Sequence, residues 1–192
     1  HAQSYPNKPI KFVVPFSAGS ATDNVGRIIA QAMSDAWGQP ITIENKAGAN
    51  GILGAESVKA APADGYTFLV TTSTTQAANV HLYRKLPYDP VKDFTPIGKI
   101  GEVGFILMVA NDFPAKNMKE FVSYAKAHPG KLAYGHGSSG SLVSAAMLTE
   151  LAGLETVGVP YKSIPPALTD LLGGQIQFAF ADTGNAVSQM NG

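Results

Sequence analysis

Two short segments rich in glycine and serine are the parts of this sequence best suited to bind a ligand. They are Ser17-Ala18-Gly19-Ser20 and Gly137-Ser138-Ser139-Gly140-Ser141. Each follows an apolar run typical of a strand and precedes a segment with helical periodicity. The first N–H groups of a helix lack intrahelical partners and carry about half a positive charge, so an acid group can bind there. Neither segment contains Arg or Lys. We therefore expect peptide dipoles and hydroxyl groups to neutralise an acid.

The same residue types allow two other interpretations. Serine and glycine also cap helices and close turns without binding anything. In addition, the run from Gly135 to Gly140 matches G-x-G-x-x-G between a strand and a helix, as in dinucleotide-binding folds. The next predicted strand, however, ends Val159-Pro160-Tyr161-Lys162 and offers no acidic residue for a ribose. A nucleotide-cofactor-binding α/β enzyme that uses this loop remains the alternative hypothesis.

Patterns for catalysis or metal binding are weak. The chain has no cysteine, which excludes disulfides, thiolate nucleophiles and cysteine-based zinc sites. The G-x-S-x-G and Walker A patterns are absent, and of the four histidines only His136 lies in a candidate loop. The formal net charge of zero gives no electrostatic reason to expect nucleic acid as a partner. We expect a protein that is not an enzyme and that holds no metal and no cofactor.

Alternating strand and helix patterns position these segments at strand ends. Strands are predicted at 10–14, 41–44, 66–70, 105–110, 132–134, 156–160 and 176–181, and helices at 22–37, 51–61, 118–127, 141–151 and 165–172. This order predicts a doubly wound parallel α/β sheet in two units, 1–103 and 104–192. Ligands bind beyond the carboxyl ends of strands in such sheets. Four loops fall there, at 16–22, 71–79, 136–141 and 182–185.

The first predicted helix has a recognisable start and a predicted buried face. Ser20 and Asp23 fit a capping box, with Ser20 as N-cap and Asp23 reaching back to it. The residues expected on the buried face share helical spacing and are Val25, Ile28, Ile29, Ala32, Met33 and Ala36.

Motifs along the whole chain resemble the substrate-binding receptors of tripartite tricarboxylate transporters, the Bug-type receptors. They include Tyr5-Pro6-Asn7-Lys8-Pro9-Ile10, Glu44-Asn45-Lys46-Ala47-Gly48, Asp64-Gly65-Tyr66-Thr67, Leu86-Pro87-Tyr88-Asp89-Pro90, Pro129-Gly130-Lys131-Leu132, Val159-Pro160-Tyr161-Lys162 and Asp170-Leu171-Leu172-Gly173-Gly174-Gln175. The resemblance implies a periplasmic-binding-protein-like fold of type II, a two-lobed Venus flytrap. Family members are longer and return to the first lobe, so it also implies that the C-terminal portion is missing, with the first lobe incomplete and the second lacking its last strand.

The resemblance further implies a function. The expected function is an extracytoplasmic receptor that captures a small carboxylic acid, a dicarboxylate or an aromatic carboxylate, in an interdomain cleft. The expected partners are the membrane subunits of a tripartite uptake system, the expected state is a monomer, and nucleic acid is not expected. The start His1-Ala2-Gln3 fits a periplasmic protein whose signal peptide is removed near Ala2.

The predicted ligand-binding residues combine the loop analysis with this resemblance. They are Phe16, Ser17, Ala18, Gly19, Ser20, Thr22, Asp23, Thr74, Gln76, Asn79, His136, Gly137, Ser138, Ser139, Gly140, Ser141, Tyr161 and Asp182. Phe16 and Tyr161 are expected to form apolar walls, and Asp182 either binds a ligand hydroxyl or amine or caps a helix. His136 stands where the family usually has serine, and it would favour an acidic ligand if it were protonated.

Overall fold

The computed structural model describes residues 5–190, and its contacts divide the chain into two compact units, His1–Lys99 and Ile100–Gly192. We describe each unit by itself. The division after Lys99 lies near the predicted boundary after residue 103, and the assignment of lobes at 1–103 and 104–192 stays a prediction. The predicted signal-peptide cleavage near Ala2 lies outside the described residues.

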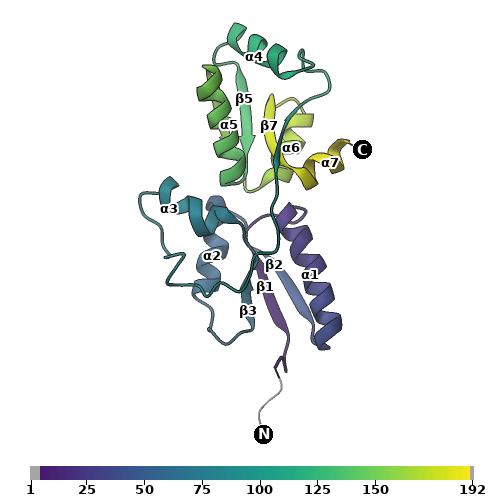
Figure 1. Cartoon of the computed structure of the whole chain (residues 1–192), viewed down its shortest axis with the longest axis vertical. Helices are drawn as coiled ribbons and strands as arrows, with labels where there is room; N and C mark the ends of the chain where they lie inside the picture. Colours follow the sequence, from purple (N-terminus) through teal and green to yellow (C-terminus); the bar gives the residue numbers. More distant parts are fainter. Residues whose placement is uncertain (1–4, 191–192) are drawn as a thin grey trace. The chain divides into compact units, whose positions relative to one another are not determined.

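The first unit is built on a three-stranded parallel sheet. Its strands are β1 (Ile10–Val14), β2 (Ile41–Asn45) and β3 (Thr67–Leu69), in the order β2-β1-β3. Helix α1 (Ala21–Trp37) and helix α2 (Ile52–Lys59) lie on opposite faces of this sheet (Figure 1). Side chains alternate between the faces of a strand, so Ile10, Phe12 and Val14 join the core beneath α1.

Small residues determine which side of α1 is buried. Gly26 and Ala30 face the sheet, and a Cβ at Gly26 would lie 3.5 Å from Val70. The predicted face was wrong in part, because Val25 and Ile28 are 39% and 70% exposed. The absence of bulk at Gly26 lets the helix approach the sheet closely, which turns these two larger side chains outward.

Three shorter helical segments complete the first unit. They are η1 (Ala49–Gly51), the π-helical turn η2 (Thr74–Ala78) and α3 (Asn79–Leu82). The prediction of a loop over 71–79 was therefore wrong for its second half. Threonines have low helix propensity, and tertiary hydrogen bonds hold this turn, including one of 2.7 Å from the Tyr88 hydroxyl to the Thr75 carbonyl.

The second unit has a mixed four-stranded sheet. Its strands are β4 (Phe105–Val109), β5 (Leu132–His136), β6 (Thr156–Pro160) and β7 (Phe178–Asp182), in the order β4-β7-β5-β6. β5 pairs in parallel with β6 and β7, whereas β4 runs antiparallel to β7. The wholly parallel sheet predicted from the alternation was thus wrong for β4.

Helices cover both faces of this second sheet. They are α4 (Met118–Ala127), α5 (Ser139–Ala152), α6 (Ile164–Leu172) and α7 (Thr183–Met190). One core gathers Leu132, Tyr134 and Phe178 with side chains of α4 and α5. The other gathers Ala179 and Ala181 with α6 and α7. Over residues 5–190, no helix combines the length and apolar character needed to cross a membrane.

Candidate functional site

The parallel strands of each unit bring the predicted loops to one edge of each sheet. In the first unit, the chain leaves β1 at Pro15 and β3 at Val70, and both strands pair in parallel. In the second unit, His136 ends β5, and Asp182 ends β7, which also runs parallel to β5. Each unit therefore carries its own candidate half-site, and we describe the two in turn.

The loop between β1 and α1 is closed by local hydrogen bonds. The Ser20 hydroxyl accepts from the Asp23 N–H at 3.2 Å and so caps α1, while the Ser20 N–H donates to the Ser17 carbonyl at 3.1 Å. The Asp23 carboxylate accepts from the Gly19 N–H at 2.9 Å rather than from Ser20. The predicted capping box is therefore only half formed, because the carboxylate reaches one residue further back, to a glycine with φ of 79°.

Other polar groups of this loop remain available. Among residues 5–190, the N–H groups of Ala21 and Thr22 and the hydroxyls of Ser17 and Thr22 have no hydrogen-bond partner. Ala21 and Thr22 occupy the first turn of α1, where backbone donors lack intrahelical acceptors. Ala21 was missed in the sequence analysis because its methyl side chain gives no signal, and the N-cap position of Ser20 is what could have identified it.

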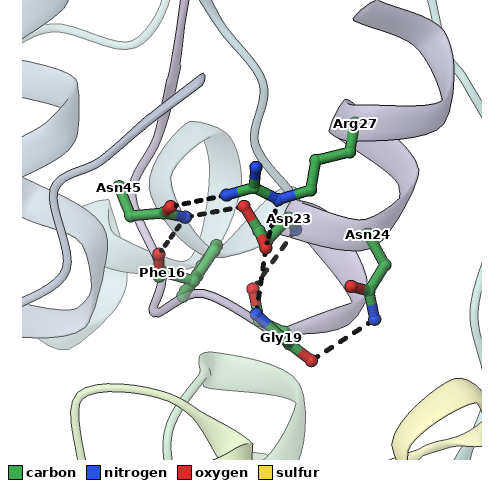
Figure 2. A network of polar contacts seen from close by, with 7 residues as sticks. Phe16, Gly19, Asp23, Asn24, Arg27 and Asn45 are labelled. Carbon is green, nitrogen blue, oxygen red and sulfur yellow. Dashed lines mark hydrogen bonds and ion pairs between the residues drawn. The ribbon is translucent and has the colours of Figure 1, made fainter. Parts of the chain in front are cut away.

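Asp23 is the centre of a polar network beneath this loop (Figure 2). It is 1% exposed and accepts from the Arg27 Nε at 3.0 Å and from the Asn45 Nδ2 at 2.8 Å. Burial by itself raises the pKa of Asp23, but hydrogen bonds from Arg27, Asn45 and Gly19 outweigh it and the net pKa is lowered. Asp23, predicted as a ligand contact, thus has its oxygens engaged within the protein.

The second half-site begins at Ser138, the N-cap of α5. Ser138 and Ser141 form a capping box, with the Ser138 hydroxyl accepting from the Ser141 N–H at 3.3 Å. The Ser141 hydroxyl accepts from the N–H groups of both Gly137 and Ser138 at 3.1 Å. The helix was predicted to begin at Ser141 but begins at Ser139, because this box compensates for the low helix propensity of Ser139 and Gly140. Gly140 therefore places its N–H in the first helical turn.

The G-x-G-x-x-G pattern has a packing explanation. A Cβ on Gly135 would lie 2.6 Å from Ile176, one on Gly137 would overlap the Ser163 backbone, and one on Gly140 would overlap the Phe105 ring. The space beside each glycine is filled by protein atoms, so none of the three is needed to let a pyrophosphate approach. This packing disfavours the nucleotide-cofactor hypothesis.

Three further predicted residues lie at the same edge of the second sheet. His136 is half-buried, and burial lowers its pKa, so the neutral imidazole is favoured and a protonated His136 at neutral pH is not supported. The Tyr161 hydroxyl donates to Asp170 at 2.7 Å; burial first, and then this carboxylate, raise the Tyr161 pKa to about 12. Asp182 accepts from the Asn185 N–H at 2.9 Å, the geometry of a helix cap.

The remaining predicted residues of the first unit are largely buried. Asn79 is 0% exposed; its amide donates to the Asn50 carbonyl at 3.0 Å and accepts from the Asn50 side chain at 2.8 Å. Thr74 is also buried, and Gln76 donates to the Pro90 carbonyl at 3.4 Å. The Phe16 ring packs in the core rather than forming a wall, whereas Ala18 is exposed. The ligand contacts predicted for this set stay predictions.

Ser163 is a polar residue at this edge that sequence reasoning missed. It is the N-cap of α6 and 1% exposed, yet its hydroxyl has no hydrogen-bond partner. An N-cap hydroxyl normally accepts from the second or third helical N–H, and those positions are Pro165 and Pro166, which have none. The two prolines are the sequence signal that could have revealed an uncapped serine.

Metal chemistry finds no support in the part of the chain that the structure describes. Within residues 5–190 there is no group of three or more His, Cys, Asp or Glu side chains that could hold a metal ion. Both half-sites instead consist of helix starts, hydroxyls and glycines. Such a set can bind an acid group through hydrogen bonds and dipoles.

Comparisons with known proteins find relatives over most of this chain. The tripartite tricarboxylate transporter family receptor profile matches residues 25–191. Protein BugT of Bordetella pertussis is 35% identical over 180 residues, which are 91% of this chain and 55% of BugT. The chain therefore spans about half the length of this relative.

Several solved structures also resemble this chain. MatC from Rhodopseudomonas palustris, with bound malate, is 38% identical with a TM-score of 0.90, over 97% of this chain and 64% of MatC. R. palustris Rpa4515, with adipate, is 35% identical with a TM-score of 0.90, over 93% of this chain and 60% of Rpa4515. The periplasmic binding protein BugD is 36% identical with a TM-score of 0.91, over 97% of this chain and 63% of BugD. These likenesses confirm the predicted α/β periplasmic-binding-protein fold.

Proposed function

This chain belongs to the tripartite tricarboxylate transporter receptor family, a family of transport receptors and not of enzymes, and we propose that it binds a small carboxylic acid for uptake. The proposed ligand is a dicarboxylate or an aromatic carboxylate. The proposed partners are the membrane subunits of a tripartite transporter, which the chain meets as a monomer.

One observation carries the proposal: each unit has a helix that starts at the carboxyl end of a sheet strand with a serine cap. Ser20 caps α1 after β1, and Ser138 caps α5 after β5. In α1 the N–H groups of Ala21 and Thr22 and two hydroxyls are left for a ligand. A carboxylate is the acceptor that such donors suit best, and each charged hydrogen bond contributes about 1.5–3 kcal/mol.

The ligand class is supported by the relatives. MatC was solved with malate and Rpa4515 with adipate, two dicarboxylic acids of different length. The α1 start, with two N–H groups and two hydroxyls available, suits a ligand with an acid group and further oxygen atoms. We propose dicarboxylates as the first class to test and aromatic acids as the second.

The proposed location is the periplasm. BugD is described as a periplasmic binding protein, and a receptor that delivers solute to a membrane transporter works on the extracytoplasmic side.

Calorimetric titration tests the proposal. Malate, adipate and benzoate are titrated into the 192-residue chain, with the dimethyl ester of malate as the uncharged control. We expect heat from at least one acid and none from the ester, because dipoles at helix starts recognise charge. The variant Thr22→Val removes a hydroxyl at nearly constant volume and should weaken binding about five- to tenfold, as expected for one hydrogen bond.

A matched variant separates recognition from general damage. Ser123→Ala removes an exposed hydroxyl from the middle of α4, and its affinity should equal that of the unmodified chain. Binding of NADH, seen as a change in its fluorescence, together with no heat from any acid would contradict the proposal and favour a nucleotide site.

A further inference from the structure

Asn45, the last residue of β2, has every polar side-chain atom engaged. Its Nδ2 donates to the Phe16 carbonyl at 3.1 Å and to the Asp23 Oδ1 at 2.8 Å. Its Oδ1 accepts from the Arg27 Nη2 at 3.2 Å. Figure 2 shows the hydrogen bonds that join this side chain to Phe16, Asp23 and Arg27. An asparagine amide has two donor hydrogens and one acceptor oxygen, and here each is used.

These contacts join segments that are far apart in sequence. Val14 and Asn45 are partners in the parallel pairing of β1 with β2, so the end of β2 lies beside the point where the chain leaves β1. From there Asn45 holds Phe16 directly. It holds Gly19 through Asp23, whose Oδ2 accepts the Gly19 N–H at 2.9 Å. One side chain thus fixes both ends of the Phe16–Gly19 loop.

We infer that Asn45 is the positioning residue of the first half-site, fixing the loop that leads into the unpartnered donors of α1. The part of this inference that concerns a ligand rests on the proposed function. Asn45 itself need not contact the acid, because it acts through Phe16 and Asp23. Asp23 accordingly serves as an internal link to Gly19 rather than as a ligand contact.

The hydrogen-bond pattern requires an amide at position 45. Aspartate has the same shape but no donor, so it would place oxygen atoms against the Phe16 carbonyl and the Asp23 carboxylate. Reversing the amide would direct its NH₂ at the Arg27 guanidinium, which has only donors. Arg27 in turn forms an ion pair of 3.0 Å with Asp23, so the loop carries no uncompensated negative charge that would repel an acid.

The test compares two Asn→Asp substitutions that make the same charge change beside the same loop. Asn45→Asp breaks the contacts to Phe16 and Asp23. Asn24→Asp alters an exposed residue whose side chain donates one 3.4 Å hydrogen bond to the Gly19 carbonyl. Backbone amide resonances of residues 16–20 are recorded without ligand, and affinity for malate, adipate and benzoate is measured by calorimetry.

We expect Asn45→Asp to shift the resonances of residues 16–20 and to weaken acid binding roughly tenfold or more, as for loss of hydrogen bonds to charged groups. Asn24→Asp should change the loop resonances much less, and its added charge should weaken acid binding less than Asn45→Asp does. Equal effects of the two substitutions, or unchanged loop resonances in Asn45→Asp, would overturn the inference. If Asn45→Asp does not fold, Asn45→Ala is compared with Asn24→Ala by the same two measurements. Alanine places no oxygen atom against the Phe16 carbonyl or the Asp23 carboxylate.

The two measurements also separate this inference from the proposed function. If the unmodified chain binds none of the acids while Asn45→Asp still displaces the loop, the positioning role stands and the proposed ligand class fails. If the unmodified chain binds an acid and Asn45→Asp binds it equally well, the proposed function stands and the positioning role fails.

Discussion

The α-carbon of Gly137 lies so close to the backbone of Ser163 that a Cβ on residue 137 would overlap the Ser163 carbonyl group. This contact joins the segment that leaves β5 to the N-cap of α6. Tyr161 strengthens the junction, since its N–H donates to the His136 carbonyl at 2.8 Å. The start of α5 and the start of α6 therefore lie in direct contact at this edge of the sheet.

Gly137→Ala should destabilise the second unit. The added methyl group meets backbone atoms that cannot turn away, so we expect the free energy of unfolding to fall by roughly 1–3 kcal/mol. Urea unfolding measures the change. Gly173→Ala is the control, because its φ is −79° and the nearest atom to a Cβ is 3.4 Å away; it should change stability by less than about 0.5 kcal/mol. Equal stability of the two variants would show that the contact at Gly137 is not tight.

Ser163→Ala should keep or raise stability. The Ser163 hydroxyl is buried without a partner, and an unsatisfied buried polar group costs about 1–3 kcal/mol. Removing it should therefore give a change between zero and a gain of about 1 kcal/mol in urea unfolding. Most buried polar-to-apolar changes destabilise, so the direction is diagnostic. A loss above about 1 kcal/mol would mean that the hydroxyl has a partner, such as an ordered water.

The regular elements were largely predictable from the sequence. The runs Ile10–Val14 and Thr156–Pro160 are strands with the predicted bounds, because β-branched residues between turn signals favour a strand locally. The direction of β4 was not predictable, since a strand sequence carries no information on which neighbour it will pair with. The buried face of α1 was missed in part, because apolar periodicity ranks Ile28 above Gly26, whereas close packing requires the smaller residue.

The site was predictable at the level of loops but not of individual roles. Serines before helices marked both half-sites, since capping is a local interaction. The engagement of Asp23 and Asn79 within the protein depends on Asn45 and Asn50, which are distant in sequence. Only the folded chain brings these partners together. Side-chain type alone therefore could not separate a ligand contact from a residue that holds the loop.

Asp23→Asn should lower the free energy of unfolding at neutral pH. It should also remove part of the loss of stability that the unmodified chain shows in acid. The folded-state pKa of Asp23 is lowered, so its ionised form stabilises the fold above the ordinary value of 3.8. This contribution is lost as the pH falls through the folded-state pKa. We expect Asp23→Asn to be less stable at pH 7 by about 1–3 kcal/mol, with the difference shrinking below pH 3.8.

Urea unfolding between pH 7 and pH 3 gives the comparison for Asp23. The control is Asp112→Asn, because Asp112 is exposed and its replacement should change stability by less than about 0.5 kcal/mol. A stability difference between Asp23→Asn and the unmodified chain that stays constant down to pH 3 would contradict the favoured ionised state of Asp23.

His136→Asn should change how stability responds to mild acid. Burial lowers the pKa of His136 below 6.5, so the unfolded chain takes up a proton before the folded chain does. The titration of His136 therefore does not affect the free energy of unfolding above pH 6.5. As the pH falls from 6.5 towards the lower folded-state pKa, this titration decreases the free energy of unfolding. His136→Asn removes this titration and should flatten the decline, whereas His81→Asn, at an exposed position in α3, should not.

Acid binding near His136 should be coupled to proton uptake by this residue. A carboxylate close to His136 would favour the imidazolium form and raise the pKa of His136, so binding near pH 6 would take up protons. Calorimetry of malate binding in buffers with different ionisation enthalpies measures this uptake, which should disappear in His136→Asn. Binding of malate without proton uptake in the unmodified chain would place the acid away from His136, and the half-site would then consist of the α5 helix start without the imidazole.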